Sequence, residues 1–320
     1  MSTSNGAGPW RCLVVGCEGL EEKRPIAPTA IDLARASGAK LALTHVVRAP
    51  PRTFRALGSP PAKQIHSDLV DTRRALLTEL SDSIEASGIE TDAKLRIGHP
   101  HMELIREGTE RDADMIVVQE RRQKSNGELG FAAVTTKLLR KSPLPVLALR
   151  TPRIDSPNRV AVALDVEADL DENELGQFNS TLLKQGSALA RFLGGSLDVI
   201  HVWSVWCEQQ MRNRGQRTGE EIEQIRTRVE ADRRTRLEVA IAAAGLSAEE
   251  TRMHLIRGDA GRAIPAFVQQ RQTGILVMGT LARTGVASIL IGNTAEQLIN
   301  RLPCSVLAMK PPGFVSPVLR

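Results

Sequence analysis

The stretch that decides the fold runs from Gly274 to Pro311 and reads GILVMGTLARTGVASILIGNTAEQLINRLPCSVLAMKP. It opens with the short apolar run 275–278, which predicts a buried parallel strand. It closes, after Pro303, with a second apolar run at 304–309, which predicts another strand of the same kind. Because a loop and a helix separate the two runs, the stretch has the pattern of an α/β unit.

The segment between the two runs contains a loop with several glycines and then a helix that begins around 292–294. Asn293 is expected to cap this helix, and Glu296 completes the sequence pattern of a capping box. A strand, a glycine loop and a helix N-terminus in this order offer backbone N–H groups and the positive end of a helix dipole to an anion. The stretch therefore predicts contact with a negatively charged group, usually a phosphate.

These residues resemble the last third of a universal stress protein domain, and their GT…RTG…GNTAE pattern is similar to that of the tandem, E-type members. Family members that bind ATP carry G-x-x-G and, after a spacer, a third glycine followed by Ser or Thr. Here Gly279 and Gly292 take the places of the first and third glycines. Ala282 replaces the second glycine, and Asn293 stands at the Ser/Thr place. The resemblance implies the family fold and a partly retained nucleotide motif.

The resemblance also implies where an adenine nucleotide such as ATP would bind. The implied nucleotide-binding residues are Asp165, Gly279, Ala282, Gly285, Gly292, Asn293 and Thr294. Asp165 follows the expected strand 159–164, and in nucleotide-binding members an acidic residue there faces the adenosine end of the ligand. On the residues alone, this Asp is equally an ordinary turn residue, and the glycines equally serve backbone conformation and close packing.

The chain contains two copies of one unit. RIGHPHMELI at 96–105 corresponds to IRGDAGRAIP at 256–265, and KSPLPVLALR at 141–150 corresponds with the same spacing to RLPCSVLAMK at 301–310. In each copy short apolar strands alternate with helices, which predicts parallel α/β units with right-handed crossovers. Five strands per copy predict two doubly wound sheets, each with its ligand site beyond the carboxyl ends of the strands.

The expected domain organisation follows from these two copies. It consists of a flexible tail at 1–10, a first domain at 11–150, a linker at 151–157, a second domain at 158–311 and a tail at 312–320. Both copies end in an apolar strand whose sheet edge needs cover. Since such strands meet across a two-fold axis in dimeric family members, we expect the two halves to form an internal pseudo-dimer. The resemblance also allows a homodimer.

The first copy is expected to have lost the nucleotide site. Gln119, Ala132 and Cys17 are read here as taking the places of the first glycine, the third glycine and the acidic residue. Its loop contains other glycines and basic residues, for which a solvated loop is the favoured reading. His45 and His201 occupy matching strand ends, and we expect structural roles for both.

Composition places the protein among ordinary soluble proteins. Its 320 residues suit two domains of about 150 residues each, and 42% of them are hydrophobic and 25% charged. No apolar run approaches the roughly 20 residues that span a bilayer, and the N-terminus lacks the pattern of an export signal. We therefore expect a cytoplasmic protein without a membrane span.

The net charge of +5 and a pI near 9.3 do not predict a nucleic-acid partner. Basic residues are mixed with acidic ones along the chain, tyrosine is absent, and aromatic residues make up only 3%. The four cysteines form no C-x-x-C pair, which favours reduced, mostly buried thiols. His99 and His101 lack the neighbouring ligands of a zinc site.

Three functional hypotheses remain from the sequence. The first is a regulatory protein with at most one weak adenine-nucleotide pocket, in the second domain. The second is an interaction protein that holds a lipid or a protein partner in the cleft between the domains. The third, an ATP-hydrolysing enzyme, is not favoured, because the sequence contains no P-loop, no nucleophile elbow and no visible metal ligand set.

Overall fold

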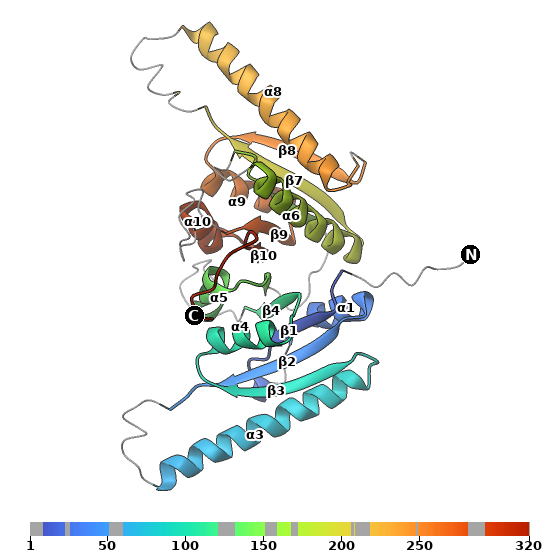
Figure 1. Ribbon diagram of the computed structural model, residues 1–320, viewed down its shortest axis with the longest axis vertical. Coiled ribbons are helices and arrows are strands. Elements are labelled where there is room, and N and C mark those ends of the chain that lie inside the picture. Colours follow the sequence, from blue (N-terminus) through green and yellow to red (C-terminus); the bar gives the residue numbers. More distant parts are fainter. Residues whose placement is uncertain are drawn as a thin grey trace, which may run out of the picture. The chain divides into compact units, whose positions relative to one another are not determined.

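The computed structural model describes residues 9–22, 26–50, 60–120, 132–150, 159–167, 172–205, 208, 218–247, 249–280 and 292–319 (Figure 1). The chain divides into two compact units, which are described separately. Unit 1 comprises Met1–Asp155, Ser305–Lys310 and Phe314–Arg320, and unit 2 comprises Ser156–Cys304 and Pro311–Gly313. Unit 1 thus holds the first repeat together with the last strand of the second repeat.

Unit 1 is built on a sheet in which five strands run parallel in the order β3-β2-β1-β4-β5. These strands are β1 (Cys12–Gly16), β2 (Lys40–Val47), β3 (Thr91–Ile97), β4 (Met115–Gln119) and β5 (Val146–Leu149). The connecting helices lie on both faces of the sheet (Figure 1). They are a 3-10 turn at Leu20–Glu22, α1 (Pro28–Ser37), α3 (Pro60–Glu85), α4 (Pro100–Glu110) and α5 (Ala133–Lys141).

Unit 2 repeats this arrangement with four parallel strands in the order β9-β6-β7-β8. The strands are β6 (Arg159–Ala163), β7 (Ser196–Trp203), β8 (Thr251–Arg257) and β9 (Ile275–Gly279). The helices are α6 (Glu172–Phe192), α8 (Gly219–Ala243), α9 (Ala260–Arg271) and α10 (Asn293–Arg301). The parallel strands of each unit are doubly wound and belong to one ten-stranded sheet, so the predicted fold class of tandem α/β domains is confirmed.

The central strands are the most apolar segments of each unit. The runs MIVV in β4 and ILVM in β9 are almost completely buried, because helices cover both faces of a parallel sheet. Helix α8 begins after Thr218 with a capping box, in which the Thr218 side chain accepts from the Glu221 N–H. Helix α3 begins at Pro60, since proline is tolerated in the first turn of a helix.

The last strand of the second repeat, β10 (Ser305–Met309), pairs with β5 in unit 1. The two strands are antiparallel, with Leu307 opposite Leu147. The prediction that the final strands of the two copies pair with each other is therefore confirmed. This strand pair also covers the edge of β5, which would otherwise present unpaired backbone groups.

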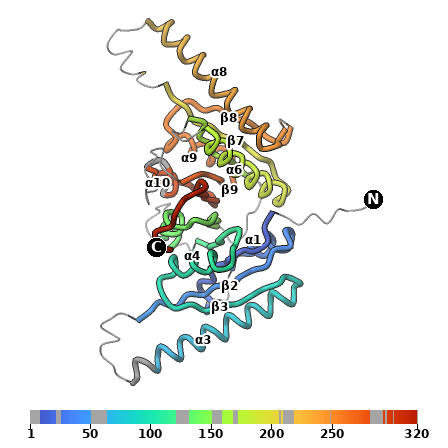
Figure 2. The backbone as a smooth tube through the Cα atoms, in the orientation of Figure 1, coloured from blue at the N-terminus to red at the C-terminus, as the bar shows by residue number. Residues whose placement is uncertain are grey.

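The segment after β10, assigned to a tail from the sequence, packs against the end of α5 in unit 1 (Figure 2). The Ser316 hydroxyl donates to the Lys141 carbonyl oxygen at 2.7 Å, and the Lys310 ammonium donates to the Leu139 carbonyl oxygen at 2.9 Å. Val318 is buried in the same segment. These donors satisfy carbonyl groups that the last turn of a helix leaves without intrahelical partners.

Candidate functional site

Each unit has a topological switch point where two neighbouring strands send their connections in opposite directions. In unit 1 it lies between β1 and β4, and in unit 2 between β6 and β9. Ligands of open α/β sheets bind beyond the carboxyl ends of the strands at this point. In unit 2 the predicted site residues Asp165 and Gly279 lie at these strand ends, while Ala282 and Gly285 lie outside the described residues.

Asp165 shapes the loop that follows β6. Its Oδ1 accepts a hydrogen bond from the Glu167 N–H at 2.9 Å, and its main-chain oxygen accepts from Asn179 Nδ2 at 3.0 Å. The first bond is the Asx-turn interaction typical of aspartate at a strand-to-loop junction. One oxygen of this carboxylate is therefore engaged in local structure, and Asp165 links the strand end to α6.

Gly279, the last residue of β9, allows a close contact with α6. A Cβ added at Gly279 would lie 2.8 Å from Cε1 of Phe178, which is too close for a real contact. Phe178 belongs to the first turns of α6, a helix of 21 residues whose counterpart α1 has only 10. Close strand–helix packing thus explains this glycine without a ligand.

The helix after the predicted loop begins one residue later than the capping prediction requires. Gly292 is the N-cap of α10, with φ −62° and ψ 146°, and Asn293 is already the first helical residue. The predicted cap by Asn293 is therefore wrong. The Gly292 N–H donates to the Thr280 carbonyl oxygen at 3.2 Å, which ties the helix start to the end of β9. Asn293 and Thr294 form the first helical positions, where backbone N–H groups have no acceptor within the helix.

The two histidines at matching strand ends link neighbouring strands. His45 Nδ1 lies 2.6 Å from the Cys17 carbonyl oxygen, and His201 Nδ1 lies 3.1 Å from the Leu164 carbonyl oxygen. Because the two histidines hold the same register position in β2 and β7, Cys17 is structurally equivalent to Leu164. Both histidines therefore serve the fold by joining the second strand of a unit to the end of its first strand.

This register corrects the alignment of the two copies. Cys17 was matched to Asp165 from the sequence, but the residue in the place of Asp165 is Glu18. The first repeat thus retains an acidic residue at the end of its first strand, and Glu18 is exposed there. Apolar runs alone do not define where a strand ends, which is why the alignment slipped by one residue. Burial raises the pKa of the Cys17 thiol to about 12, so this cysteine stays protonated.

Sequence reasoning missed a second acidic residue of the first repeat, Glu120, which directly follows β4. Glu120 Oε2 accepts a hydrogen bond from the Ala132 N–H at 2.8 Å, and Ala132 is the N-cap of α5. Burial raises the pKa of this carboxyl group, although hydrogen bonds from Thr135 and Ala132 and the charge of Arg150 act in the opposite direction. A carboxylate therefore already stands at the helix start of the first repeat.

The sequence patterns also gave no indication of a buried aspartate in unit 2. Asp198 on β7 is fully buried, and its Oδ1 lies 2.6 Å from His254 Nε2 and 3.4 Å from Arg271 Nη2. The His254 ring packs edge-on against Phe267, with ring centroids 4.7 Å apart. These contacts join β7, β8 and α9. The cluster thus holds the unit together away from the strand ends.

The described residues do not assemble a metal centre. His99 and His101 have ring centroids 6.3 Å apart, and burial lowers the pKa of His101 to about 4, so its imidazole is neutral near pH 7. Within the described ranges, no group of three or more His, Cys, Asp and Glu side chains could hold a metal ion. In the same part of the chain, no helix combines the length and the apolar character needed to cross a bilayer.

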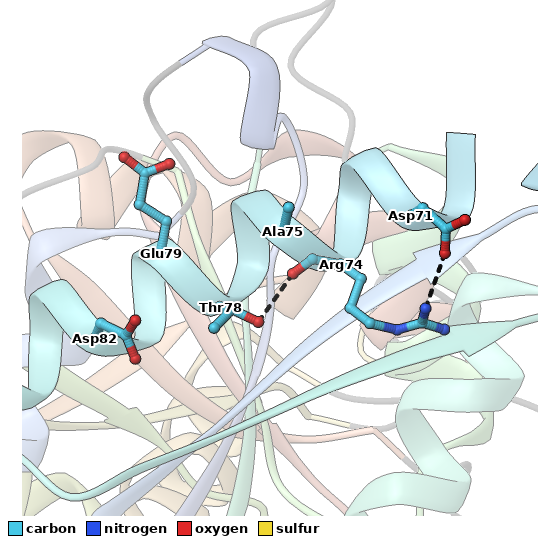
Figure 3. A pocket seen from close by; sticks show the side chains of 6 residues that line it. All are labelled: Asp71, Arg74, Ala75, Thr78, Glu79 and Asp82. Carbon is cyan, nitrogen blue, oxygen red and sulfur yellow. Dashed lines mark hydrogen bonds and ion pairs between the residues drawn. The ribbon is translucent and has the colours of Figure 1, made fainter. Parts of the chain in front are cut away.

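A hollow of about 580 Å³ lies on the surface of α3 (Figure 3). All of its lining residues come from this one helix: Asp71, Arg74, Ala75, Thr78, Glu79 and Asp82. Arg74 pairs with Asp71 at 3.0 Å, and the Thr78 hydroxyl donates to the Arg74 carbonyl oxygen at 3.1 Å. One exposed helix face does not enclose a ligand, so we assign no site to this hollow.

The fold and its strand-end sites define a tandem α/β protein with two doubly wound repeats. A sequence model of the Universal stress protein family matches residues 10–150 and 179–310. The chain therefore belongs to the universal stress protein family.

Several universal stress proteins are similar to this chain in sequence. The Universal stress protein E homolog of Haemophilus influenzae is 23% identical over 80% of this chain and 81% of its own length. Universal stress protein E of Photorhabdus laumondii is 26% identical over 72% of this chain and 73% of its own length. In Escherichia coli strain K12, Universal stress protein E is 41% identical over 22% of each chain.

Solved structures show the same fold. A functionally unknown protein from Pseudomonas aeruginosa PAO1 superposes with a TM-score of 0.70 and 23% identity, over 97% of this chain and 96% of that one. A universal stress protein from Archaeoglobus fulgidus superposes with a TM-score of 0.62 and 18% identity, over 93% of this chain and 98% of that one. At these identities the comparison supports the fold.

Proposed function

We propose that this universal stress protein is a non-catalytic, cytoplasmic binding protein of the stress response. Its second repeat receives the phosphate end of an adenine nucleotide at the start of α10, weakly and with one ligand per chain. The proposed contacts come from Asp165 and Gly279 at the strand ends and from Gly292, Asn293 and Thr294 at the helix start. Ala282 and Gly285 belong to the same motif.

The observation that carries this proposal is the contrast between the two helix starts. In the first repeat the Ala132 N–H already has a carboxylate acceptor, Glu120. In the second repeat, among the described residues, the matching Gly292 N–H donates to the neutral Thr280 carbonyl oxygen, and Gly292 has no side chain. A helix N-terminus favours an anion through its amides and its dipole, and this supports the start of α10 as the place for a phosphate.

Weak binding follows from what this site lacks. The Asp165 carboxylate is partly engaged with the Glu167 N–H, which reduces its capacity to accept hydrogen bonds from a ribose. Ala282 carries a Cβ at a place where the family motif has glycine. Each lost hydrogen bond to a charged ligand group weakens binding by on the order of tenfold or more. We therefore expect a regulatory pocket of low affinity.

The non-catalytic part of the proposal rests on the requirements of phosphoryl transfer. That chemistry needs metal ions, a positioned nucleophile or water, and a cationic group on the transferred phosphate. The sequence carries no P-loop, and His45 and His201 join strands through the Cys17 and Leu164 carbonyls. Binding without turnover is the simpler function for such a site.

Native mass spectrometry of the purified full chain, followed by calorimetry with ATP, tests the proposal. We expect at most one nucleotide per chain. Two equivalent nucleotide sites, or a nucleotide held by the first repeat alone, would contradict the proposal. A co-purifying lipid or protein without any nucleotide would support the alternative role of an interaction protein.

A pair of substitutions at the N-cap of α10 tests whether the nucleotide phosphate binds at this helix start. Gly292→Asp and Gly292→Asn both introduce good N-cap residues, and they differ only in charge. The backbone of Gly292 is compatible with either, because its φ of −62° is accessible to all residues. If phosphate binds there, the Asp variant loses ATP binding while the Asn variant retains most of it. Equal binding by both variants would place the nucleotide elsewhere.

A further inference from the structure

The start of α5 in unit 1 is already arranged around a negative charge. Glu120 follows β4, and its Oε2 lies 2.8 Å from the nitrogen of Ala132, twelve residues further along the chain. Thr135, in the first turn of α5, also hydrogen-bonds to this carboxyl group. One main-chain amide, one hydroxyl and the positive end of a helix dipole therefore converge on one carboxylate, as they do on a bound oxyanion.

The carboxylate of Glu120 is a poorly solvated group. Only 8% of the residue is exposed, and among the described residues Oε1 has no hydrogen-bond partner. The charge of Arg150 favours the ionised form of this carboxyl group and the charge of Glu18 disfavours it. A buried carboxylate with one unpartnered oxygen carries a desolvation cost. A capping carboxylate on the protein surface would avoid this cost, so ordinary helix capping does not explain why Glu120 is buried at this position.

In the second repeat the residue that corresponds to Glu120 is uncharged. Thr280 follows β9 as Glu120 follows β4, and Gly292 caps α10 as Ala132 caps α5. There the N-cap amide donates to the Thr280 main-chain oxygen at 3.2 Å. The two repeats thus differ in the acceptor of the N-cap amide, which is a carboxylate oxygen in the first repeat and a main-chain oxygen in the second.

We propose that Glu120 is the resident anion of the first repeat: its carboxylate occupies an oxyanion site at the start of α5 and keeps that site closed to external ligands. When the side chain is shortened, the vacated site takes a small carboxylate or phosphate from solution. The inference does not depend on nucleotide binding by the second repeat.

Chemical rescue tests this inference in the full-length chain. Glu120→Ala deletes a CH₂–COO⁻ group, for which acetate is the matching ligand. We expect acetate to stabilise this variant in a saturable manner, while chloride at equal ionic strength does not. Above the dissociation constant, each tenfold increase in acetate concentration should raise Tm by on the order of 3–6 °C in a unit of this size. Inorganic phosphate, tested separately, shows whether the site also accepts a tetrahedral anion.

Three controls separate this site from a general effect of anions. The wild-type chain retains its own carboxylate and should not respond to acetate. Glu120→Gln keeps an amide oxygen for the Ala132 N–H and fills the same space, so it should not respond either. Thr280→Ala makes the matching change in the second repeat, where no carboxylate is removed. Equal acetate responses in all four proteins would overturn the inference.

A local readout places the bound anion. In the Glu120→Ala variant the amide resonance of Ala132 should shift with acetate concentration and follow the same binding curve as Tm. If this variant does not fold alone, acetate should restore its folded fraction, as measured by circular dichroism. A folded variant without an acetate-dependent shift at Ala132, or an unfolded one that acetate does not rescue, contradicts the inference. Loss of ATP binding by the second repeat would leave this result unchanged, so the two proposals fail independently.

Discussion

Ala282 is the single residue of the nucleotide motif with the largest expected effect on affinity. Alanine enters positive-φ conformations less readily than glycine, and Ala282 occupies a place in the sequence where the family motif has glycine. We expect Ala282→Gly to strengthen ATP binding by on the order of tenfold to a hundredfold, measured by calorimetry. Asn293→Ser should change little, because the Asn amide can also donate to phosphate. An unchanged affinity of Ala282→Gly for ATP would show that Ala282 does not cause the weak binding, and Asp165 would be the next residue to test.

Gly279 provides a second prediction at the residue scale. Gly279→Ala places a methyl group 2.8 Å from the Phe178 ring, and overpacking of this kind costs about 1–3 kcal/mol. The free energy of unfolding, measured with urea, should fall by that amount. Phe178→Leu shortens the opposing side chain, so the double variant should recover most of the loss. A loss of the same size in both backgrounds would show that the ring is not the obstacle.

At the scale of elements, the capping box of α8 has a measurable consequence. The Thr218 side chain accepts from the Glu221 N–H, and the Glu221 carboxylate accepts from the Thr218 N–H at 2.7 Å. Thr218→Ala removes the first bond and should cost about 1 kcal/mol. Faster hydrogen exchange in the first turn of α8 is the expected observation. Thr227→Ala, in the middle of the same exposed helix, is the matched control and should leave exchange nearly unchanged.

A lysine that follows β10 and contacts the end of α5 has a charge that depends on pH. Burial lowers the pKa of Lys310 from an ordinary value of 10.5 to about 7, while its Nζ donates to the Leu139 carbonyl and lies 5.2 Å from the centroid of the Phe314 ring. Between about pH 7 and pH 10.5 the unfolded chain therefore holds a proton that the folded chain has lost. Stability should rise with pH across this window by up to about 1.4 kcal/mol per pH unit.

Urea unfolding at several pH values measures this effect. Lys310→Met removes the titrating group, so the increase in unfolding free energy with pH that Lys310 causes should be absent in this variant. The unfolding free energy of the wild type minus that of the variant should therefore increase from pH 7 to pH 10. Lys137→Met removes a positive charge from the exposed side of α5, the helix that Lys310 contacts, and serves as the control. A difference between wild type and Lys310→Met that stays constant with pH would show that Lys310 remains protonated in the folded chain.

At the scale of the whole molecule, unit 1 depends on residues from the far end of the chain. Strand β10 pairs with β5, and the segment that follows contributes Ser316 and Val318 to the end of α5. Removal of residues 314–320 should destabilise unit 1 and leave unit 2 nearly unaffected. Burial of one valine side chain alone contributes about 1.5–3 kcal/mol. Hydrogen exchange of α5, compared with that of α9, is the direct measurement.

Two matched point variants distinguish a specific contact from a general effect of truncation. Val318→Ala shortens a buried side chain and should increase exchange in α5. Val315→Ala makes the same change at a residue that is 57% exposed and should have little effect. Equal effects of the two variants would contradict packing of this segment on unit 1.

The features that could be predicted from the amino-acid sequence alone are those that depend on residues close together in the chain. Apolar runs such as 115–118 and 275–278 predicted the central strands, because a strand buried on both faces must be apolar throughout. The capping box of Thr218 and Glu221 is a local pattern of the same kind, since both of its groups lie within one turn. The repeated order of strands and helices then restricted the fold to doubly wound sheets.

The candidate sites were decided by contacts between residues far apart in the chain. The packing of Phe178 on Gly279 and the equivalence of Glu18 to Asp165 depend on which strands are neighbours and in what register. The approach of Glu120 to the Ala132 amide depends on how the connection between β4 and α5 folds back. The register between strands that are far apart in the chain follows from which of their faces are buried together, and a short stretch of sequence does not reveal this. For this reason the sequence alone defined two repeats, whereas only the tertiary structure revealed that one helix start already holds a carboxylate.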